Sequence, residues 1–276
     1  MSVSNSSDAH VSLQKPDGQP LNLPSTDEYG SLLPQLLSEP RFCKISWGIS
    51  WVIKPFELFK DNFSVWLAVG LIFCVASLIG AYVPIVEVFF NVISIIIIGV
   101  IILICAAQAQ NEDLDFTELW LKLKVQLKPL IILSLLFVVG IVVVLIPLLI
   151  LFGFMSVTAS LDIEAIKLQE YPMGALIFSG IVSLVLFLLL LMAMWFAPAL
   201  IILHGLEPKI AMKSSLKGFL ANLLPMIVYS LIGGIILLFF LSITLGFGIV
   251  IALPWVMMNH YISYRDVWTD QPLSAI

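Results

Sequence analysis

The sequence predicts an all-α integral membrane protein with six transmembrane helices in three hairpin-like pairs. Three observations predict this fold. Apolar residues make up 61% of the 276-residue chain and charged residues only 11%, whereas soluble domains carry about 25% charged residues. The apolar residues form six runs, and the length of most runs is close to what a helix needs to cross a bilayer, about 20 residues. Nearly every Lys and Arg residue falls in the gaps on one side of these runs.

The polar ends of the chain set the limits of the membrane domain. Residues 1–40 are rich in Ser, Pro and Asp, a composition that buries too little apolar surface to offset the entropy of ordering. We expect a disordered cytoplasmic tail without a secretory signal, in which residues 29–37 form one short contact segment. The six-span membrane domain then covers residues 41–268, and residues 269–276 form a short cytoplasmic C-terminus.

The predicted spans cover residues 63–82, 85–109, 129–152, 174–203, 225–242 and 245–261. A single helix over residues 225–261 would be about 55 Å long, which far exceeds a hydrocarbon layer of about 30 Å. Because Gly relieves the backbone in tight turns, we expect a turn near Gly246 and Gly248. All but one of the 13 Lys and Arg residues then lie on one side, and the exception is Lys167. The positive-inside rule places both termini in the cytoplasm.

An amphipathic segment precedes each pair of spans. These segments, over residues 46–60, 115–127 and 208–220, are predicted to be interfacial helices with apolar faces toward the membrane. A polar amide precedes the first span of each pair, at Asn62, Gln126 and Asn222, and Pro stands three residues after the second and third of these amides, where it begins the span. Proline suits the first turn of a helix. The pattern indicates a threefold internal repeat. The alternative is that any cytoplasmic loop between spans becomes amphipathic.

Few polar residues lie inside the spans. Small residues four apart, such as Ser179 with Ser183 and Ser230 with Gly234, are predicted to let helices approach closely. Glu87 lies near an outer edge, where its carboxylate can reach water. Motifs for metalloprotease, serine hydrolase or phosphate chemistry are absent from the sequence, and no basic patch with aromatics predicts a nucleic-acid partner. We therefore predict no catalytic residue, no metal and no cofactor.

The cytoplasmic ends carry the candidate site residues. His204, Glu207, His260 and Asp266 are predicted to form a polar cluster, and two His with a carboxylate is also a legitimate metal shell. A second set, of cations, is predicted to contact anionic lipid headgroups: Lys209, Lys213, Lys217 and Arg265. Each Lys near an anionic surface contributes about 1 kcal/mol, although the same charges could serve orientation alone. Pro198 is predicted to kink the fourth span, because it lacks the N–H for a carbonyl one turn earlier.

Several loose motifs resemble those of an uncharacterised family of bacterial inner-membrane proteins. This family is also similar to the membrane portion found with some glycerophosphodiester phosphodiesterases. The matching stretches are residues 47–59 (Trp47, Trp51 and FELF), 195–199 (WFAPA), 211–215 (AMKSS) with Asn222, and 263–266 (SYRD). These stretches are spread from about residue 45 to residue 268, which is nearly the whole predicted membrane domain. The resemblance implies a six-span protein of the bacterial inner membrane and no catalytic residue.

Two functions follow as hypotheses. The first is a non-enzymatic membrane protein, a compact six-helix bundle with a cytoplasmic collar, which contacts lipids and binds a protein partner or a second copy as a scaffold. The alternative is a transporter or flippase of an apolar or lipid-like solute, which needs a cavity near Asn91, Ser134 and Ser230. An intramembrane enzyme would need His204 and His260 within about 5 Å of each other and of a carboxylate.

Overall fold

The structure is a computed structural model of the whole chain. It describes residues 33–82, 84–110, 112, 114–161 and 173–275, without the side chains of residues 81, 84–92 and 158–161. The chain divides into two units, Met1–Gln35 and Leu36–Ile276. The predicted disordered tail therefore falls largely outside the described residues. The helices discussed below all belong to the second unit.

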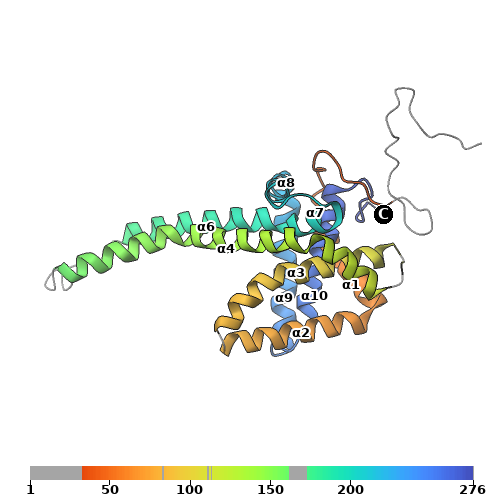
Figure 1. Cartoon of the computed structure of the whole chain (residues 1–276), viewed down its shortest axis with the longest axis horizontal. Helices are drawn as coiled ribbons and strands as arrows, with labels where there is room; N and C mark the ends of the chain where they lie inside the picture. The colour runs from red at the N-terminus through yellow and green to blue at the C-terminus, as the bar shows by residue number, and fades with distance from the viewer. Residues whose placement is uncertain (1–32, 83, 111, 113, 162–172, 276) are drawn as a thin grey trace, which may run out of the picture. The chain divides into compact units, whose positions relative to one another are not determined.

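The described residues of the second unit form helices and connecting turns, with one isolated β-bridge between Leu36 and Thr269. This architecture agrees with the all-α prediction. The helices labelled in Figure 1 are α1 (Trp47–Asp61), α2 (Phe63–Tyr82), α3 (Pro84–Ala109), α4 (Phe116–Leu161), α6 (Met173–Trp195), α7 (Ala197–His204), α8 (Pro208–Ala221), α9 (Leu223–Ile243) and α10 (Ile249–Trp268).

The prediction of six membrane spans needs correction. Within the described residues, four segments are long and apolar enough to cross a membrane: Phe63–Gly80, Phe116–Val157, Met173–His204 and Leu223–Ile243. The predicted spans over residues 85–109 and 245–261 are not among them. The described apolar part of α3, Ile93–Ala109, is shorter than a full span. The chain is a multi-pass membrane protein by the length and hydropathy of its helices.

Helix α10 differs from a lipid-facing span because its second half is polar and buried in protein. Asn259, Arg265 and Asp266 are each at most 5% exposed. Ionisable side chains are costly next to lipid and find partners inside a protein. The apolar run that predicted a sixth span therefore ends within a core helix, which continues to Trp268.

Two of the three amphipathic segments are separate helices, and the second is not. Asn62 and Asn222 end α1 and α8 with backbone angles outside the helical region, and α2 and α9 begin at the next residue. In contrast, Gln126 and Pro129 lie inside the continuous helix α4. Gln is a good helix former, whereas Asn competes for backbone hydrogen bonds and favours helix ends. The threefold pattern thus holds at this junction for the first and third copies only.

The predicted turn between the last two apolar runs lies between α9 and α10. Helix α9 ends at Ile243 and α10 begins at Ile249. Leu245 and Gly246 adopt positive φ angles of 51° and 89°. Gly246 tolerates such an angle without a steric penalty, because glycine has no Cβ atom.

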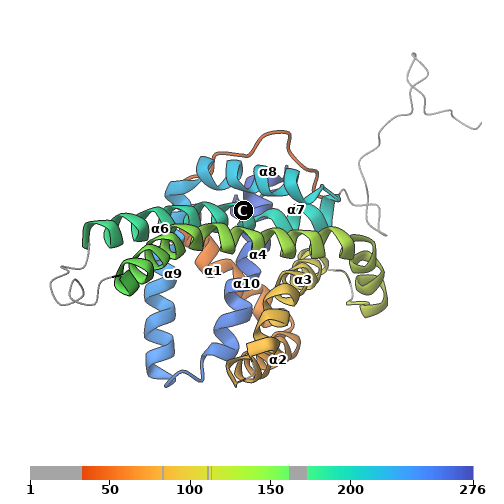
Figure 2. The same ribbon diagram turned by 60° about the vertical axis from the view of Figure 1, so that its left-hand side comes forward.

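The long helices do not all run alongside one another, as the predicted compact six-helix bundle would require. The hairpin of α4 and α6 crosses α9 and α10 instead of running alongside them (Figures 1 and 2). Close crossings depend on glycines that the small-residue pairs did not identify. A Cβ atom at Gly70 in α2 would lie 1.8 Å from the carbonyl oxygen of Val250 in α10, whereas one at Gly234 would meet nothing within 4 Å. Hydropathy sets which helices enter a membrane, but interlocking side chains set how they cross.

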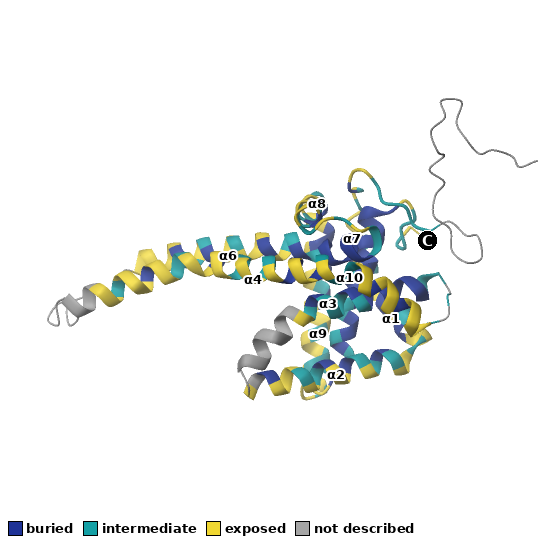
Figure 3. Cartoon of the chain, in the orientation of Figure 1, coloured by how far each residue is buried: buried dark blue, intermediate teal, exposed yellow. Residues whose placement is uncertain are grey.

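The buried core lies around α7 and α10, while α2, α4 and α6 carry long exposed stretches (Figure 3). Leu36 and Leu37 join this core from the N-terminal side. Leu36 bridges Thr269, and the N–H of Leu37 donates to the carbonyl of Trp268 at 2.9 Å. The predicted contact segment over residues 29–37 is confirmed for these two residues, so order begins before the predicted boundary at residue 41.

Candidate functional site

The helix that begins at Met173 is interrupted at Phe196. Helix α6 ends at Trp195 and α7 begins at Ala197, with Pro198 in its first turn. The break therefore lies where Pro198 predicted an interruption. Because buried backbone groups need hydrogen-bond partners, those beside the break must find them on other helices.

Ser215 of α8 supplies one of these partners. Its hydroxyl accepts from the N–H of Phe196 at 2.9 Å and donates to the carbonyl of Met192 at 2.8 Å. In an unbroken helix, this N–H would bond directly to this carbonyl four residues earlier. The Ser215 hydroxyl, which is fully buried, thus inserts into the hydrogen-bond ladder and holds the break open.

Helix α10 supplies the other partners. The Nδ1 atom of His260 lies 2.9 Å from the carbonyl oxygen of Trp195, and the indole Nε1 of Trp195 donates to the Ser263 hydroxyl at 3.0 Å. The rings of Trp195 and His260 lie against each other, with centroids 4.4 Å apart and planes tilted by 35°. We call Trp195, Ser215, His260 and Ser263 the break cluster. These residues join α6, α8 and α10 at one point.

A cavity of about 430 Å³ lies beside the break cluster. Its wall includes Trp195, Pro198 and His260, with further side chains from α3, α4, α8 and α9. The lining is largely aliphatic and aromatic, and it contains no Asp, Glu, Lys or Arg residue. Known small-molecule sites occupy about 300–1,000 Å³ and are mostly apolar with a few polar groups, so this cavity has the size and character of a binding site.

The cavity opens between α6 and α9. On its lining, Leu188 of α6 and Ser230 of α9 are exposed, whereas Met194, Met226 and Tyr229 are buried. The exposed residues mark the mouth and the buried ones the floor. Both flanking helices belong to segments apolar enough to span a membrane.

The cavity contains one of the three polar residues at which the sequence predicted a transport cavity. Ser230 lines it. Ser134 does not, and its buried hydroxyl donates to the carbonyl of Leu130. The side chain of Asn91 lies outside the described residues. Sequence reasoning missed Trp195 and Ser215 as site residues, although Pro198 signalled that nearby backbone groups would need partners.

The predicted cytoplasmic polar cluster is divided among different partners. His204 hydrogen-bonds through Nε2 to the hydroxyl of Tyr264, while His260 belongs to the break cluster. Glu207 is exposed at the start of α8. Among the residues that the structure describes, no three His, Cys, Asp or Glu side chains group in a way that could hold a metal ion.

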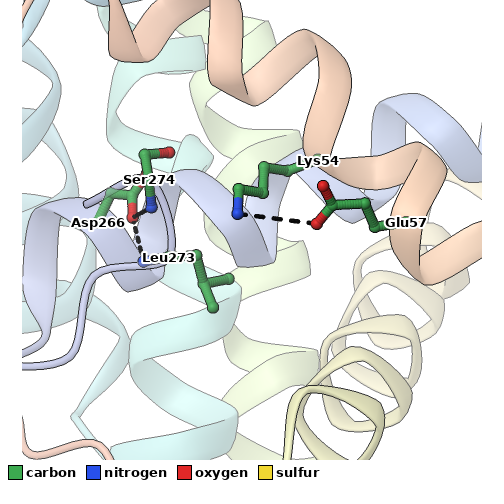
Figure 4. Close-up of polar contacts among 5 residues, drawn as sticks. All are labelled: Lys54, Glu57, Asp266, Leu273 and Ser274. Carbon is green, nitrogen blue, oxygen red and sulfur yellow. Dashed lines mark hydrogen bonds and ion pairs between the residues drawn. The ribbon is translucent and has the colours of Figure 1, made fainter. Parts of the chain in front are cut away.

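Asp266 is a buried carboxylate that binds the end of the chain. Its Oδ1 atom accepts from the backbone N–H groups of Leu273 at 2.6 Å and Ser274 at 2.9 Å (Figure 4). Its Oδ2 atom accepts from the indole Nε1 of Trp51 at 2.7 Å. Asp266 is 0% exposed, and a buried charge is tolerated when several donors satisfy it. Asp266 therefore ties α1 and the C-terminal residues to α10.

Arg265 is unsuited to the lipid contact that the sequence predicted. It is only 5% exposed, because its guanidinium donates to the Tyr261 hydroxyl at 2.7 Å and to the carbonyl of Gln271 at 3.0 Å. The sequence showed a cation near the membrane interface but not the direction of its side chain. Arg265 instead fixes the turn that follows α10.

The three lysines of α8 are exposed, as a lipid-facing row requires. Lys217 forms an ion pair with Glu39. Lys213 and Lys217 border a second cavity of about 350 Å³, together with Ser214 and Trp268. Four leucines also line it, so this cavity combines an apolar wall with two cations, whereas the lining of the cavity at the break cluster has no charged residue.

Cys43 and Asn222 fix the segment that precedes α1. The Asn222 side chain accepts from the N–H of Cys43 at 2.7 Å and donates to the carbonyl of Arg41 at 2.8 Å. The Cys43 thiol lies against the carbonyl of Asp266. Burial, followed by the charge of Asp266, raises the pKa of this thiol from 9.0 to about 12, and Arg41 partly opposes the rise. The thiol is therefore a structural group, not a reactive one.

No family model, curated protein or solved structure matches this chain. The resemblance to an uncharacterised inner-membrane family stays a prediction. The cavity and the break cluster are therefore the features of this chain that bear on its function.

Proposed function

We propose that this protein is a non-enzymatic membrane protein that binds an apolar or lipid-like solute in the cavity at the break cluster. The observation that carries the proposal is the cavity of about 430 Å³, which opens between two apolar helices and is lined without a charged residue. A carrier or flippase of such a solute needs a site of this kind, whereas a scaffold does not. The cavity therefore favours the transport hypothesis over the scaffold hypothesis.

The chemistry of the lining supports an apolar ligand. Met192, Met194 and Met226 contribute flexible thioethers to the wall, and methionine adapts to irregular apolar shapes. The volume is nearly three times the about 150 Å³ of a cavity that holds one benzene molecule. Such a space accommodates part of a long hydrocarbon chain that enters from the bilayer.

Orientation and location are part of the proposal. The positive-inside pattern supports a cytoplasmic location for both termini, and the resemblance of the sequence supports the bacterial inner membrane. In this arrangement, α3 and α10 return the chain within the protein interior. Fusion of a cytoplasm-active reporter to each terminus in turn tests the orientation, and an inactive reporter at either terminus would refute it.

Native mass spectrometry of the protein extracted from its own membrane tests the proposed binding. Ser230→Phe should fill the mouth of the cavity and reduce the bound solute at least about tenfold, because the added ring overlaps the ligand volume. Ser242→Phe is the matched control, since Ser242 is exposed on the same helix and does not line the cavity. Equal solute retention by both variants would contradict the proposal.

A second candidate function is lipid contact by a scaffold, which the exposed row of Lys209, Lys213 and Lys217 favours. Anionic headgroups would neutralise these charges at about 1 kcal/mol each. Replacing all three lysines by Gln should then reduce the retention of anionic lipids and leave the cavity solute bound. Unchanged lipid content would count against the row as a headgroup site. A copurifying protein chain, with no bound solute in wild type, would favour the scaffold.

A further inference from the structure

The hydrogen bond at the break fixes the tautomer of His260. A backbone carbonyl only accepts hydrogen bonds, so the Nδ1 atom that lies 2.9 Å from the Trp195 oxygen must carry the hydrogen. The cavity lining contains no carboxylate that would stabilise a second proton on the ring. In the neutral ring, Nε2 then has a free lone pair and acts as an acceptor.

This acceptor is available to a ligand. Within the described residues, the hydrogen bond to Trp195 is the one recorded for the His260 ring. Nε2 is not fully enclosed by protein atoms. His260 is half-buried and lines the cavity. An acceptor without a donor is unfavourable next to the apolar groups of the lining.

We propose that the cavity holds a neutral lipid alcohol, whose hydroxyl donates to Nε2 of His260 and whose hydrocarbon chain fills the apolar remainder. This inference rests on the proposed function and names the class of solute. A carboxylate or phosphate would find no cation on the lining, and an ammonium group would find no anion. A pure hydrocarbon would leave Nε2 unpaired, whereas a hydroxyl satisfies it.

Photoaffinity labelling of the full chain in phosphatidylcholine nanodiscs tests the proposal. The probes are three diazirine-bearing molecules of equal chain length that end in a primary alcohol, its methyl ether or a carboxylate. The ether keeps the oxygen of the alcohol, but it adds one methyl group and has no donor. Since a hydrogen bond to a buried acceptor changes binding by roughly tenfold, the alcohol should label peptides of α6 and α9 roughly tenfold more than the ether, and the carboxylate should label them least.

Two variants separate the hydrogen bond from the fold. His260→Asn places an amide N–H near the position of Nδ1, so it can keep the bond to Trp195 while it lacks Nε2. The preference for the alcohol over the ether should then disappear. His204→Asn is the matched control, because His204 bonds Tyr264 and does not line the cavity, and it should keep the preference.

The outcomes separate this inference from the proposed function. Equal labelling of the cavity peptides by alcohol and ether in the wild type would overturn the lipid alcohol and leave an apolar solute site. A preference that persists in His260→Asn would also overturn it. If no probe labels the cavity peptides above the rest of the membrane domain, the proposed function fails as well. The wild-type comparison stands even if His260→Asn does not fold.

Discussion

Replacing Ser215 by alanine removes the hydroxyl that bridges the helix break. The variant leaves the N–H of Phe196 and the carbonyl of Met192 without the partner that each now has at 2.9 and 2.8 Å. Each buried backbone group without a partner costs about 1–3 kcal/mol. If the break keeps its shape, the two groups together lower the free energy of unfolding by about 2–6 kcal/mol, and partial relaxation should bring the loss to about 2–4 kcal/mol.

A smaller loss would mean that the break closes. If Phe196 and Met192 bonded each other directly, only one interhelical hydrogen bond would be lost, which averages about 0.6 kcal/mol in a membrane protein. Equilibrium unfolding in mixed micelles of a mild detergent and dodecyl sulfate, followed by far-UV circular dichroism, distinguishes these values. A loss below about 1 kcal/mol would refute the argument that Ser215 holds the break open.

Ser183 of α6 provides the matched control. Ser183 is also buried, at 6% exposed. Its hydroxyl, however, has no hydrogen-bond partner in the described part of the chain. Ser183→Ala removes a polar group that makes no bond, so stability should change by less than about 0.5 kcal/mol or rise. If both variants lost the same amount of stability, alanine would be destabilising at any buried serine. The loss in Ser215→Ala would then not be caused by the missing bridge.

Three other changes test other contacts. Gly70→Ala should lower the stability of the protein by at least about 2 kcal/mol, because the added Cβ would lie 1.8 Å from the Val250 carbonyl oxygen. In the control Gly153→Ala, the added Cβ would meet nothing within 4 Å, so stability should be unchanged or rise by up to about 1 kcal/mol. Similar melting of the two variants would contradict the close crossing of α2 and α10. Asp266→Asn should cost about 2–4 kcal/mol, since its amide turns a donor toward N–H groups, and unchanged hydrogen exchange of the C-terminal amides would argue against this. With the other cysteines replaced by alanine, Cys43 at pH 8 should react slowly with iodoacetamide, because a pKa raised from 9.0 to about 12 leaves about a thousandfold less thiolate. Unfolding in dodecyl sulfate should restore its reactivity, and equal rates before and after unfolding would refute the raised pKa.

Local features of the sequence predicted several helix ends. Pro198 marked the break between α6 and α7, and the glycines near residue 246 marked the turn before α10. These predictions succeeded because the missing N–H of proline and the conformational freedom of glycine act within one turn of the chain. The prediction that a helix ends near Gln126 was wrong, because Gln126 lies inside the continuous helix α4. An Asn side chain favours a helix end, whereas a Gln side chain lets the helix continue.

The number of spans and the lipid contact of Arg265 could not be predicted in the same way. Apolar runs are equally suited to lipid and to a protein core, and only the neighbours of α10 make it a core helix. The direction of a long cationic side chain depends on acceptors such as the carbonyl of Gln271, which lies beyond the helix end. In both cases, distant parts of the chain set the environment of the residues concerned.

By itself, the sequence determined that this chain is a helical membrane protein, since hydropathy and helix propensity are sums over neighbouring residues. It also identified Pro198 as the point at which a helix is interrupted. Only the tertiary structure decided that Ser215 and His260 satisfy that interruption and that a cavity opens beside it. These contacts join residues that are 19 and 65 positions apart, and the crossing of helices that brings them together depends on side-chain packing that no local pattern encodes.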